Sequence, residues 1–169
     1  MANGSLTSCH RMPRVGRRAG QDRPAVMTTE GFGGPGQRPE LDGIPKEYVG
    51  VSWEVAYTDE FGVWWTDLDE AQQDRLAATV ALLAEHGPAL PFPHCSGING
   101  SRHAHMRELR VQSGGNPLRV FYAFDPRRAA ILLIGGDKTG RDRFYEDYVP
   151  LADDLYDAHL TELKTEGLL

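Results

Sequence analysis

The 169-residue sequence is poor in cysteine and has no long apolar run, and each shortage excludes some classes of protein. Its two cysteines, Cys9 and Cys95, offer neither a disulfide framework nor the paired spacing of a zinc site. No apolar stretch approaches the roughly 18–20 residues that cross a bilayer. The basic N-terminus has no apolar segment behind it, which argues against a secretory signal peptide. We therefore expect a cytoplasmic protein with no membrane span, no metal and no cofactor.

A nucleotide-binding loop and a histidine metal site are also missing. The segment GGDKTG lacks the Gly-x-x-x-x-Gly-Lys-Ser/Thr spacing, and Asp137 would place a carboxylate against the phosphates. His94 beside Cys95, and the pair His103 and His105, have no third or fourth ligand at a useful spacing. The sequence shows no internal repeat either.

Residues 1–45 differ in composition from the rest of the chain. They are rich in Gly, Pro, Arg and Ser and have almost no periodic apolar content. Such a segment cannot bury enough surface to offset its ordering entropy, so we predict a disordered basic tail followed by one domain, residues 46–169. The arginine cluster of this tail suits contact with RNA, and a mis-assigned start, with Met27 closer to the true beginning, is an equally good explanation; the cluster is Arg11, Arg14, Arg17 and Arg18.

Positive charge is concentrated in one part of an otherwise acidic domain. The chain has a net charge of −6, yet residues 102–143 carry nine Arg or Lys against four acids. Residues 47–101 carry one basic residue against nine acids, and residues 144–169 one against seven. A basic patch on a sheet suits a polyanion such as RNA, while a solvated face with its own ion pairs is an equally good explanation.

Apolar periodicity predicts an α+β domain with the element order β-α-α-β-β-β-α. A first strand around Trp53 to Tyr57 precedes two helices, and these lie across a small, mostly antiparallel sheet. Trp64 and Trp65 fall at helical spacing and are expected in the core rather than as base-stacking platforms. The expected later elements are a helix at about 69–85, strands at 106–112, 118–124 and 129–134, a helical turn at 142–148 broken by Pro150, and a last helix at 152–164.

Two strands carry side chains that suit phosphate and proton chemistry. Alternation on the strand at 106–112 puts Arg107 on one face with Leu109, and Glu108 with Arg110 on the other. Arg110 suits a phosphate ligand and Glu108 a general base, or the two pair with strand neighbours. His103 and His105 are further acid–base candidates because imidazole titrates near neutrality.

The order of these elements and several short motifs resemble a known toxin family. The motifs are MRELRV, PLRVFYAFD, ILLIGGDKTG, FYEDY and ADDLYDAHL, and the resemblance covers roughly residues 50–165. Together they are similar to the HigB-type branch of the RelE/ParE toxin superfamily. The resemblance implies a RelE-like fold and a toxin of a type II toxin–antitoxin pair. Most RelE and HigB members cut mRNA in the ribosomal A site, whereas ParE members inhibit gyrase.

The resemblance also implies roles for individual residues. Arg119 matches an Arg on the middle strand of the family and Lys138 a cation after the last strand, so both are expected to bind phosphate and stabilise the transition state. Tyr145 matches a tyrosine that stacks on a base or helps proton transfer, with Tyr148 as a rival. The family's lysines on the first of these strands are absent, since Arg107, Glu108 and Arg110 stand there.

The predicted site therefore has two groups of residues. The catalytic group is Arg119, Lys138, Tyr145, Arg110 and Glu108. The RNA-binding group is Arg107, His103, His105, Arg141 and Arg143.

Three functional hypotheses follow from the resemblance. The first is a metal-independent, ribosome-dependent mRNA endonuclease that inhibits translation and arrests growth. The second is a gyrase inhibitor of the ParE kind. The third is an interaction module whose catalytic set has decayed. The toxin hypotheses imply a cognate antitoxin of the helix-turn-helix, HigA-like kind, and the first also implies the ribosome and mRNA as partners.

Overall fold

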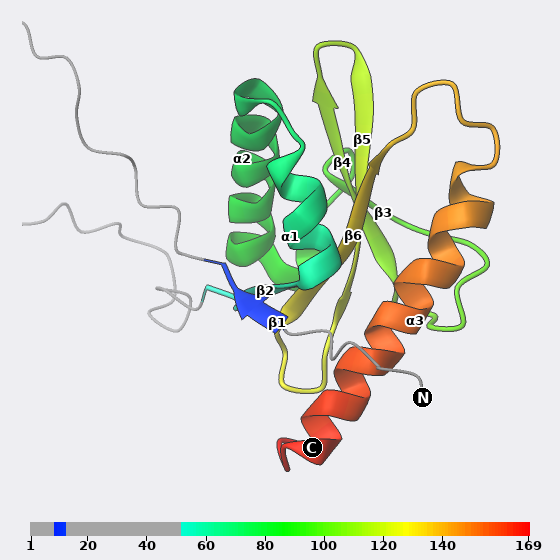
Figure 1. Ribbon diagram of the computed structural model, residues 1–169. Coiled ribbons are helices and arrows are strands. Elements are labelled where there is room, and N and C mark those ends of the chain that lie inside the picture. The colour runs from blue at the N-terminus through cyan, green and yellow to red at the C-terminus, as the bar shows by residue number, and fades with distance from the viewer. Residues whose placement is uncertain (1–8, 13–51) are drawn as a thin grey trace, which may run out of the picture. The chain divides into compact units, whose positions relative to one another are not determined.

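The computed structural model describes residues 9–12 and 52–169 (Figure 1). The α+β class is confirmed, with strands and helices in the following order. They are β1 (Cys9–Arg11), β2 (Val55–Thr58), α1 (Asp59–Thr66), α2 (Glu70–His86), the 3₁₀ turn η2 (Gly87–Ala89), β3 (Cys95–Gly97), β4 (Arg107–Ser113), β5 (Asn116–Phe124), β6 (Ala130–Asp137) and α3 (Phe144–Thr165).

All six strands form one mixed sheet in the order β1-β2-β6-β5-β4-β3. Strand β2 runs parallel to β6, and the other neighbouring strands are antiparallel. The apolar strand predicted at 129–134 is β6, and it is central and covered on both faces, as expected. It runs three residues further, to Asp137.

Two short strands were not predicted. β3 lies in the connection that was expected to be irregular, and it pairs with β4. β1 lies within the predicted tail and pairs with β2. A three-residue strand has too few positions to show an alternation in the sequence, and only its partner reveals it. Residues 1–8 and 13–45 of the tail lie outside the described residues.

Helices cover both faces of the sheet (Figure 1). On one face α1 and α2 pack Phe61, Leu83 and their neighbours against Leu109 and Leu132. On the other face α3 packs against Phe121, Ile131, Leu133 and Met106. Both tryptophans of α1, Trp64 and Trp65, pack against the first cluster, in agreement with their predicted place in the core.

Helix α2 has the ends that its sequence predicts. Asp69 accepts a hydrogen bond from the Gln72 amide at 2.8 Å, and the Gln72 side chain accepts one from the Asp69 amide at 3.1 Å. This reciprocal pair satisfies two backbone donors that the first turn leaves free. At the other end Gly87 has a φ of 55°, and a Cβ there would collide with the Trp53 indole. Helix α2 therefore begins and ends within a residue of its predicted bounds.

The predicted break at Pro150 is wrong, because α3 continues through it. Proline removes one backbone hydrogen bond and crowds the carbonyl four residues earlier, at a cost of about 3 kcal/mol. The helix keeps Phe144, Val149, Ala152 and Tyr156 buried against the sheet on either side of this proline. Burial of large apolar side chains such as Phe144 and Val149, at roughly 1.5–3 kcal/mol each, outweighs the cost of the proline.

Two adjacent glycines let both helical layers approach β6. A Cβ on Gly135 would collide with the Trp64 ring from α1, and a Cβ on Gly136 would lie 2.7 Å from Cζ of Tyr148 on α3. The two aromatic rings therefore lie against opposite faces of the same strand, with only backbone between them.

Asp125 organises the turn between β5 and β6. Its Oδ1 accepts hydrogen bonds from the amides of Arg127 at 2.9 Å and Ala129 at 3.0 Å. Its Oδ2 accepts from the Arg127 guanidinium and lies 3.1 Å from Nε2 of His159 on α3. Burial raises the pKa of the Asp125 carboxyl, but these hydrogen bonds from Ala129, Arg127 and His159 outweigh burial, and the net pKa is lowered.

Candidate functional site

Glu108 on β4 is the centre of a polar group on the face of the sheet that α3 covers. The side chain is 2% exposed. Its Oε1 accepts hydrogen bonds from Ser96 Oγ on β3 at 2.9 Å and from the Tyr145 hydroxyl on α3 at 3.2 Å. Its Oε2 is buried and has no hydrogen-bond partner in the structure. A buried carboxylate needs cations nearby, because desolvation disfavours its charge.

Two arginines supply these cations. Arg110 and Arg119 are direct partners on β4 and β5, and both side chains lie on the same face as Glu108. Arg119 Nε lies 3.6 Å and Arg110 Nη1 3.9 Å from Glu108 Oε1. The Arg119 side chain is only 8% exposed and also donates to the Leu118 carbonyl, whereas Arg110 is 34% exposed. The three groups together carry one net positive charge, and most of its exposed area belongs to Arg110.

Tyr145 and Lys138 complete the group from the other side. The Lys138 ammonium lies 4.7 Å from the centroid of the Tyr145 ring, a cation–π contact. Burial raises the pKa of the Tyr145 hydroxyl, and its hydrogen bond to Glu108 raises that pKa further. The phenol is therefore protonated at neutral pH and donates to the carboxylate. The Lys138 amide donates to the Pro117 carbonyl at 3.0 Å, which fixes the end of β6 beside β5.

The carboxylate of Asp137, at the end of β6, is bound within the turn that follows and not by this group. Asp137 Oδ1 accepts hydrogen bonds from the Thr139 amide at 2.8 Å and from the Thr139 hydroxyl at 2.6 Å, within its own turn. Arg141 donates to the Tyr148 hydroxyl at 3.2 Å. The Tyr148 ring stacks on Phe144 at 4.4 Å between centroids, so Tyr148 is held by packing and by Arg141 and does not contact Glu108.

Arg107 and Arg143 lie apart from this group. Arg107 is on the opposite face of the sheet, as alternation predicts, and its Nη2 donates to Cys95 Sγ at 3.2 Å. Arg143 is exposed and forms an ion pair of 2.7 Å with Glu146 on the first turn of α3.

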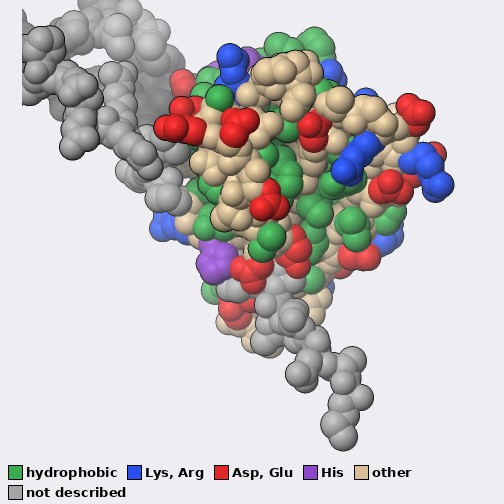
Figure 2. Space-filling model, turned by 45° about the horizontal axis from the view of Figure 1, so that its top comes forward, with side chains coloured by type: hydrophobic (Ala, Val, Ile, Leu, Met, Phe, Trp, Pro, Cys, Tyr) green, Lys and Arg blue, Asp and Glu red, His purple; other side chains and the backbone are tan. Residues whose placement is uncertain are grey.

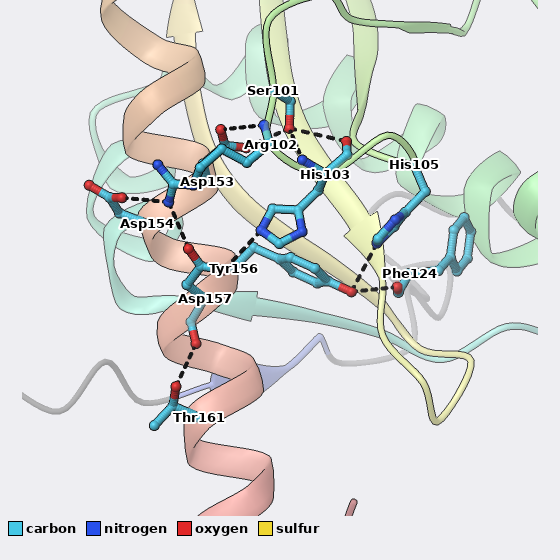
Figure 3. A network of polar contacts seen from close by, with 10 residues as sticks. All are labelled: Ser101, Arg102, His103, His105, Phe124, Asp153, Asp154, Tyr156, Asp157 and Thr161. Atoms are coloured by element: carbon cyan, nitrogen blue, oxygen red, sulfur yellow. Dashed lines mark hydrogen bonds and ion pairs between the residues drawn. The ribbon is translucent and has the colours of Figure 1, made fainter.

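His103 and His105 belong to a separate network that ties the loop before β4 to α3 (Figure 3). His103 Nε2 lies 2.9 Å from Asp157 Oδ1, and His105 Nε2 lies 3.0 Å from the Tyr156 hydroxyl. Tyr156 donates its own proton to the Phe124 carbonyl at 2.9 Å, so His105 must be the donor in its contact. Burial lowers the pKa of His105, and the neighbouring His103 adds to this effect.

The same loop is anchored through its backbone. Ser101 Oγ and the Arg102 amide both donate to the Asp153 carboxylate (Figure 3). The Arg102 guanidinium donates to Asp154 at 2.8 Å and to Asp157 at 2.6 Å. Tyr156 is three helical turns beyond Tyr145, about 16 Å along the α3 axis. This network therefore ties the loop before β4 to α3 and lies outside the group around Glu108.

The candidate site thus consists of Glu108, Arg110, Arg119, Lys138 and Tyr145, with Arg141 beside it. All five predicted catalytic residues meet in one place. Ser96, which donates to Glu108 from β3, was not predicted, because no spacing in the sequence indicates a contact between two neighbouring strands. No group of three or more His, Cys, Asp or Glu in residues 9–12 and 52–169 is arranged to hold a metal ion.

The positive charge of the site is local. In Figure 2 the basic and acidic side chains of the described residues are interspersed on the visible surface, without one continuous basic face. At the site itself, Arg110 and Arg119 lie 3.9 and 3.6 Å from the carboxylate of Glu108, and Lys138 lies over the ring of Tyr145, which donates to that carboxylate. A small anion such as one phosphate group matches this arrangement better than a long stretch of duplex does. None of the helices in the described parts of the chain is long and apolar enough to cross a membrane.

Comparison with known proteins identifies relatives that share this region. HigB2 of Mycobacterium tuberculosis, a candidate toxin by its name, is 36% identical over 116 residues, which cover 68% of this chain and 57% of HigB2. HigB3 of the same organism, named in the same way, is 38% identical over 91 residues, which cover 53% of this chain and 78% of HigB3. The chain thus spans little more than half the length of HigB2. No solved structure matches it.

The two relatives confirm the predicted resemblance to HigB-type proteins. A family model described as phage-derived protein Gp49-like (DUF891) matches residues 63–157, more than half of the chain. This range includes every residue of the candidate site. On this match, the chain belongs to the phage-derived Gp49-like family.

Proposed function

We propose that the chain is the toxin of a type II toxin–antitoxin pair, with a RelE-like fold, and that it cuts mRNA on the ribosome without a metal ion. The names of HigB2 and HigB3 support the toxin assignment. The observation that carries the proposed nuclease activity is the meeting of Glu108, Tyr145, Lys138 and Arg110 on one face of the sheet. An antitoxin of the helix-turn-helix, HigA-like kind is the proposed partner, and the cytoplasm the proposed location.

RNA cleavage without a metal has three chemical requirements. The 2′-hydroxyl must lose its proton and attack phosphorus, the charge on the phosphoryl oxygens must be neutralised, and the 5′-oxygen must gain a proton as it leaves. The products are a 2′,3′-cyclic phosphate and a 5′-hydroxyl. Lys138 and Arg110 meet the second requirement because both cations are partly exposed beside Tyr145 and Glu108.

Proton transfer is assigned to Tyr145 and Glu108. The Tyr145 hydroxyl passes its proton to Glu108 Oε1 as it takes the proton of the 2′-hydroxyl, so the buried carboxylate is the final base. Solvent supplies the proton to the leaving 5′-oxygen, and the Lys138 ammonium stabilises the negative charge that develops there. Arg119 is nearly buried against Glu108, so we assign it the positioning and charge balance of Glu108 rather than direct contact with the phosphate.

Induction of the full chain in a bacterial host tests the proposal, with growth and the 5′ ends of mRNAs followed together. Wild type is expected to arrest growth and to create new mRNA ends within translated regions, and Lys138→Ala or Tyr145→Phe is expected to abolish both. Arg75→Ala removes an exposed cation on α2, in the layer opposite α3, and is the matched control that stays toxic. Growth arrest with intact mRNA would rule out the nuclease and favour gyrase as the target.

A further inference from the structure

Phe92 is an exposed aromatic residue in the loop between η2 and β3. It is 71% exposed, the highest value among the large apolar side chains that the structure describes as exposed. A single exposed apolar side chain is common on protein surfaces and marks no site by itself. The position of Phe92 and the rigidity of its loop distinguish it.

The loop that carries Phe92 is firmly attached to the domain. Leu90 is buried, and its carbonyl accepts the Cys95 thiol hydrogen at 2.8 Å. The His94 amide donates to the Pro91 carbonyl at 3.1 Å, and the Arg110 amide donates to the His94 carbonyl at 2.8 Å. Prolines on both sides of Phe92 restrict the backbone as well. The ring is therefore held in solvent by an ordered backbone.

Arg110 connects this ring to the candidate site. Its Cζ lies over the Phe92 ring, 5.2 Å from the centroid. The same guanidinium lies 3.9 Å from Glu108 through Nη1. These contacts thus form a line that runs from the exposed ring of Phe92 through Arg110 to the buried carboxylate of Glu108. A cation and an aromatic face stand side by side at the outer end of this line.

We propose that Phe92 is a base-stacking residue, which binds one nucleobase of single-stranded RNA while Arg110 contacts the adjoining phosphate. This inference rests on the proposed function. Each nucleotide offers one aromatic face and one negative charge, and the Phe92–Arg110 pair offers the complement of both. Stacking on an exposed aromatic side chain is the usual way in which proteins hold unpaired bases, and it tolerates any base.

The test measures RNA binding rather than cleavage, so its failure and that of the proposed nuclease are distinguishable. The probe is a short single-stranded RNA that carries 2-aminopurine, whose fluorescence changes when it stacks. The full wild-type chain is expected to bind this RNA and to alter its fluorescence. Phe92→Ala is expected to weaken binding about 10-fold and to abolish the fluorescence change.

Matched variants separate stacking from apolar contact. Phe92→Leu keeps an apolar side chain without an aromatic face and should behave like Phe92→Ala, whereas Phe92→Tyr should restore binding. Val63→Ala, at an exposed apolar position of α1, should bind like wild type. Thermal unfolding shows whether each variant is folded.

Three results would overturn the proposal. The first is that the wild-type protein does not bind the RNA. The second is that Phe92→Ala binds the RNA as tightly as wild type, and the third is that Phe92→Leu equals wild type in RNA binding and in the fluorescence change. The second would instead favour a protein, such as an antitoxin, as the partner of this ring. RNA binding that depends on Phe92 without cleavage of mRNA in cells would support the stacking role and contradict the nuclease.

Discussion

The hydroxyl of Tyr145 donates a hydrogen bond to Glu108 at 3.2 Å, joining the first turn of α3 to the beginning of β4. This contact links a buried carboxylate to a phenol that is partly buried beside it. Glu108 is buried but faces two arginines, and Tyr145 is held protonated by burial and by the carboxylate it faces. Transfer of the hydroxyl proton to Glu108 leaves a phenolate unless Tyr145 takes a proton from a third group at the same time.

Tyr145→Phe tests whether this hydroxyl takes part in the reaction. The variant keeps the ring under Lys138 but removes the donor, so mRNA cleavage is expected to fall about 100-fold. The free energy of unfolding should fall by about 1.5 kcal/mol, because Glu108 loses one hydrogen bond. Cleavage rates in a translating extract and urea unfolding measure the two effects. Cleavage that equals wild type would remove Tyr145 from the mechanism.

Replacement of Glu108 should affect stability according to the group that replaces it. Glu108→Ala leaves Arg119 buried without its counter-charge, and we expect a loss of about 3–5 kcal/mol in the free energy of unfolding. The double variant Glu108→Leu with Arg119→Met removes both charges and should recover much of that loss. Chemical denaturation measures each value. Equal stability of Glu108→Ala and wild type would show that the ion pair contributes nothing.

Cleavage should depend on the charge of the side chain at position 138 rather than on its shape. Lys138→Ala is expected to lower cleavage about 100-fold, while Lys138→Arg, which keeps the cation over Tyr145, should retain a substantial part of it. Thermal unfolding of both variants should stay close to wild type because the side chain is partly exposed. Equal loss in Lys138→Arg and Lys138→Ala would point to the proton of Lys138, rather than its charge, as the necessary feature.

The carboxyl of Asp125 should make the domain sensitive to acid. Its pKa is lower in the folded state than in the unfolded state, so its contribution is complete above the ordinary value near 3.8 and is lost as pH falls toward the folded value. Asp125→Asn should therefore be less stable than wild type at pH 7. The difference between the two should shrink as pH falls from about 5 to 2. A difference that stays constant with pH would show that Asp125 acts through shape alone.

The close approach of Tyr148 to Gly136 on β6 predicts that a single added methyl group lowers the stability of the domain. Gly136→Ala would place its Cβ 2.7 Å from the Tyr148 ring, and the crowding should lower the free energy of unfolding by about 1–3 kcal/mol. Gly136→Ala with Tyr148→Leu should recover part of the loss. Gly115→Ala, in the β4–β5 turn, meets no atoms but has a φ of 88° and serves as the comparison for backbone strain alone.

The sequence predicted the faces of the sheet better than it predicted its edges. Alternation placed Glu108 and Arg110 on one face and Arg107 on the other, because each strand here has one face toward each helical layer. The short strands β1 and β3 were not predicted, because only their pairing with β2 and β4 in the folded sheet defines them. The break expected at Pro150 failed because packing of α3 against the sheet outweighs a local preference.

The candidate site shows the same division. Arg119, Lys138 and Tyr145 came from a resemblance in order and spacing, and the structure brings them together with Glu108. The histidines could not be placed from the sequence, since His103 meets an aspartate 54 residues away and His105 a tyrosine 51 residues away. The burial of Arg119 could not be predicted from the sequence either, because it depends on which groups cover β5.

The parallel pairing of β2 with β6 has a consequence for the timing of synthesis. β2 is made early, but its partner is made after both helices and three further strands, and Tyr145 follows later still. A nascent chain therefore exposes Glu108 and its arginines well before the helix that completes them. Domains fold as units as they leave the ribosome. The ribosome that makes this chain must therefore pass Tyr145 before a finished site can exist.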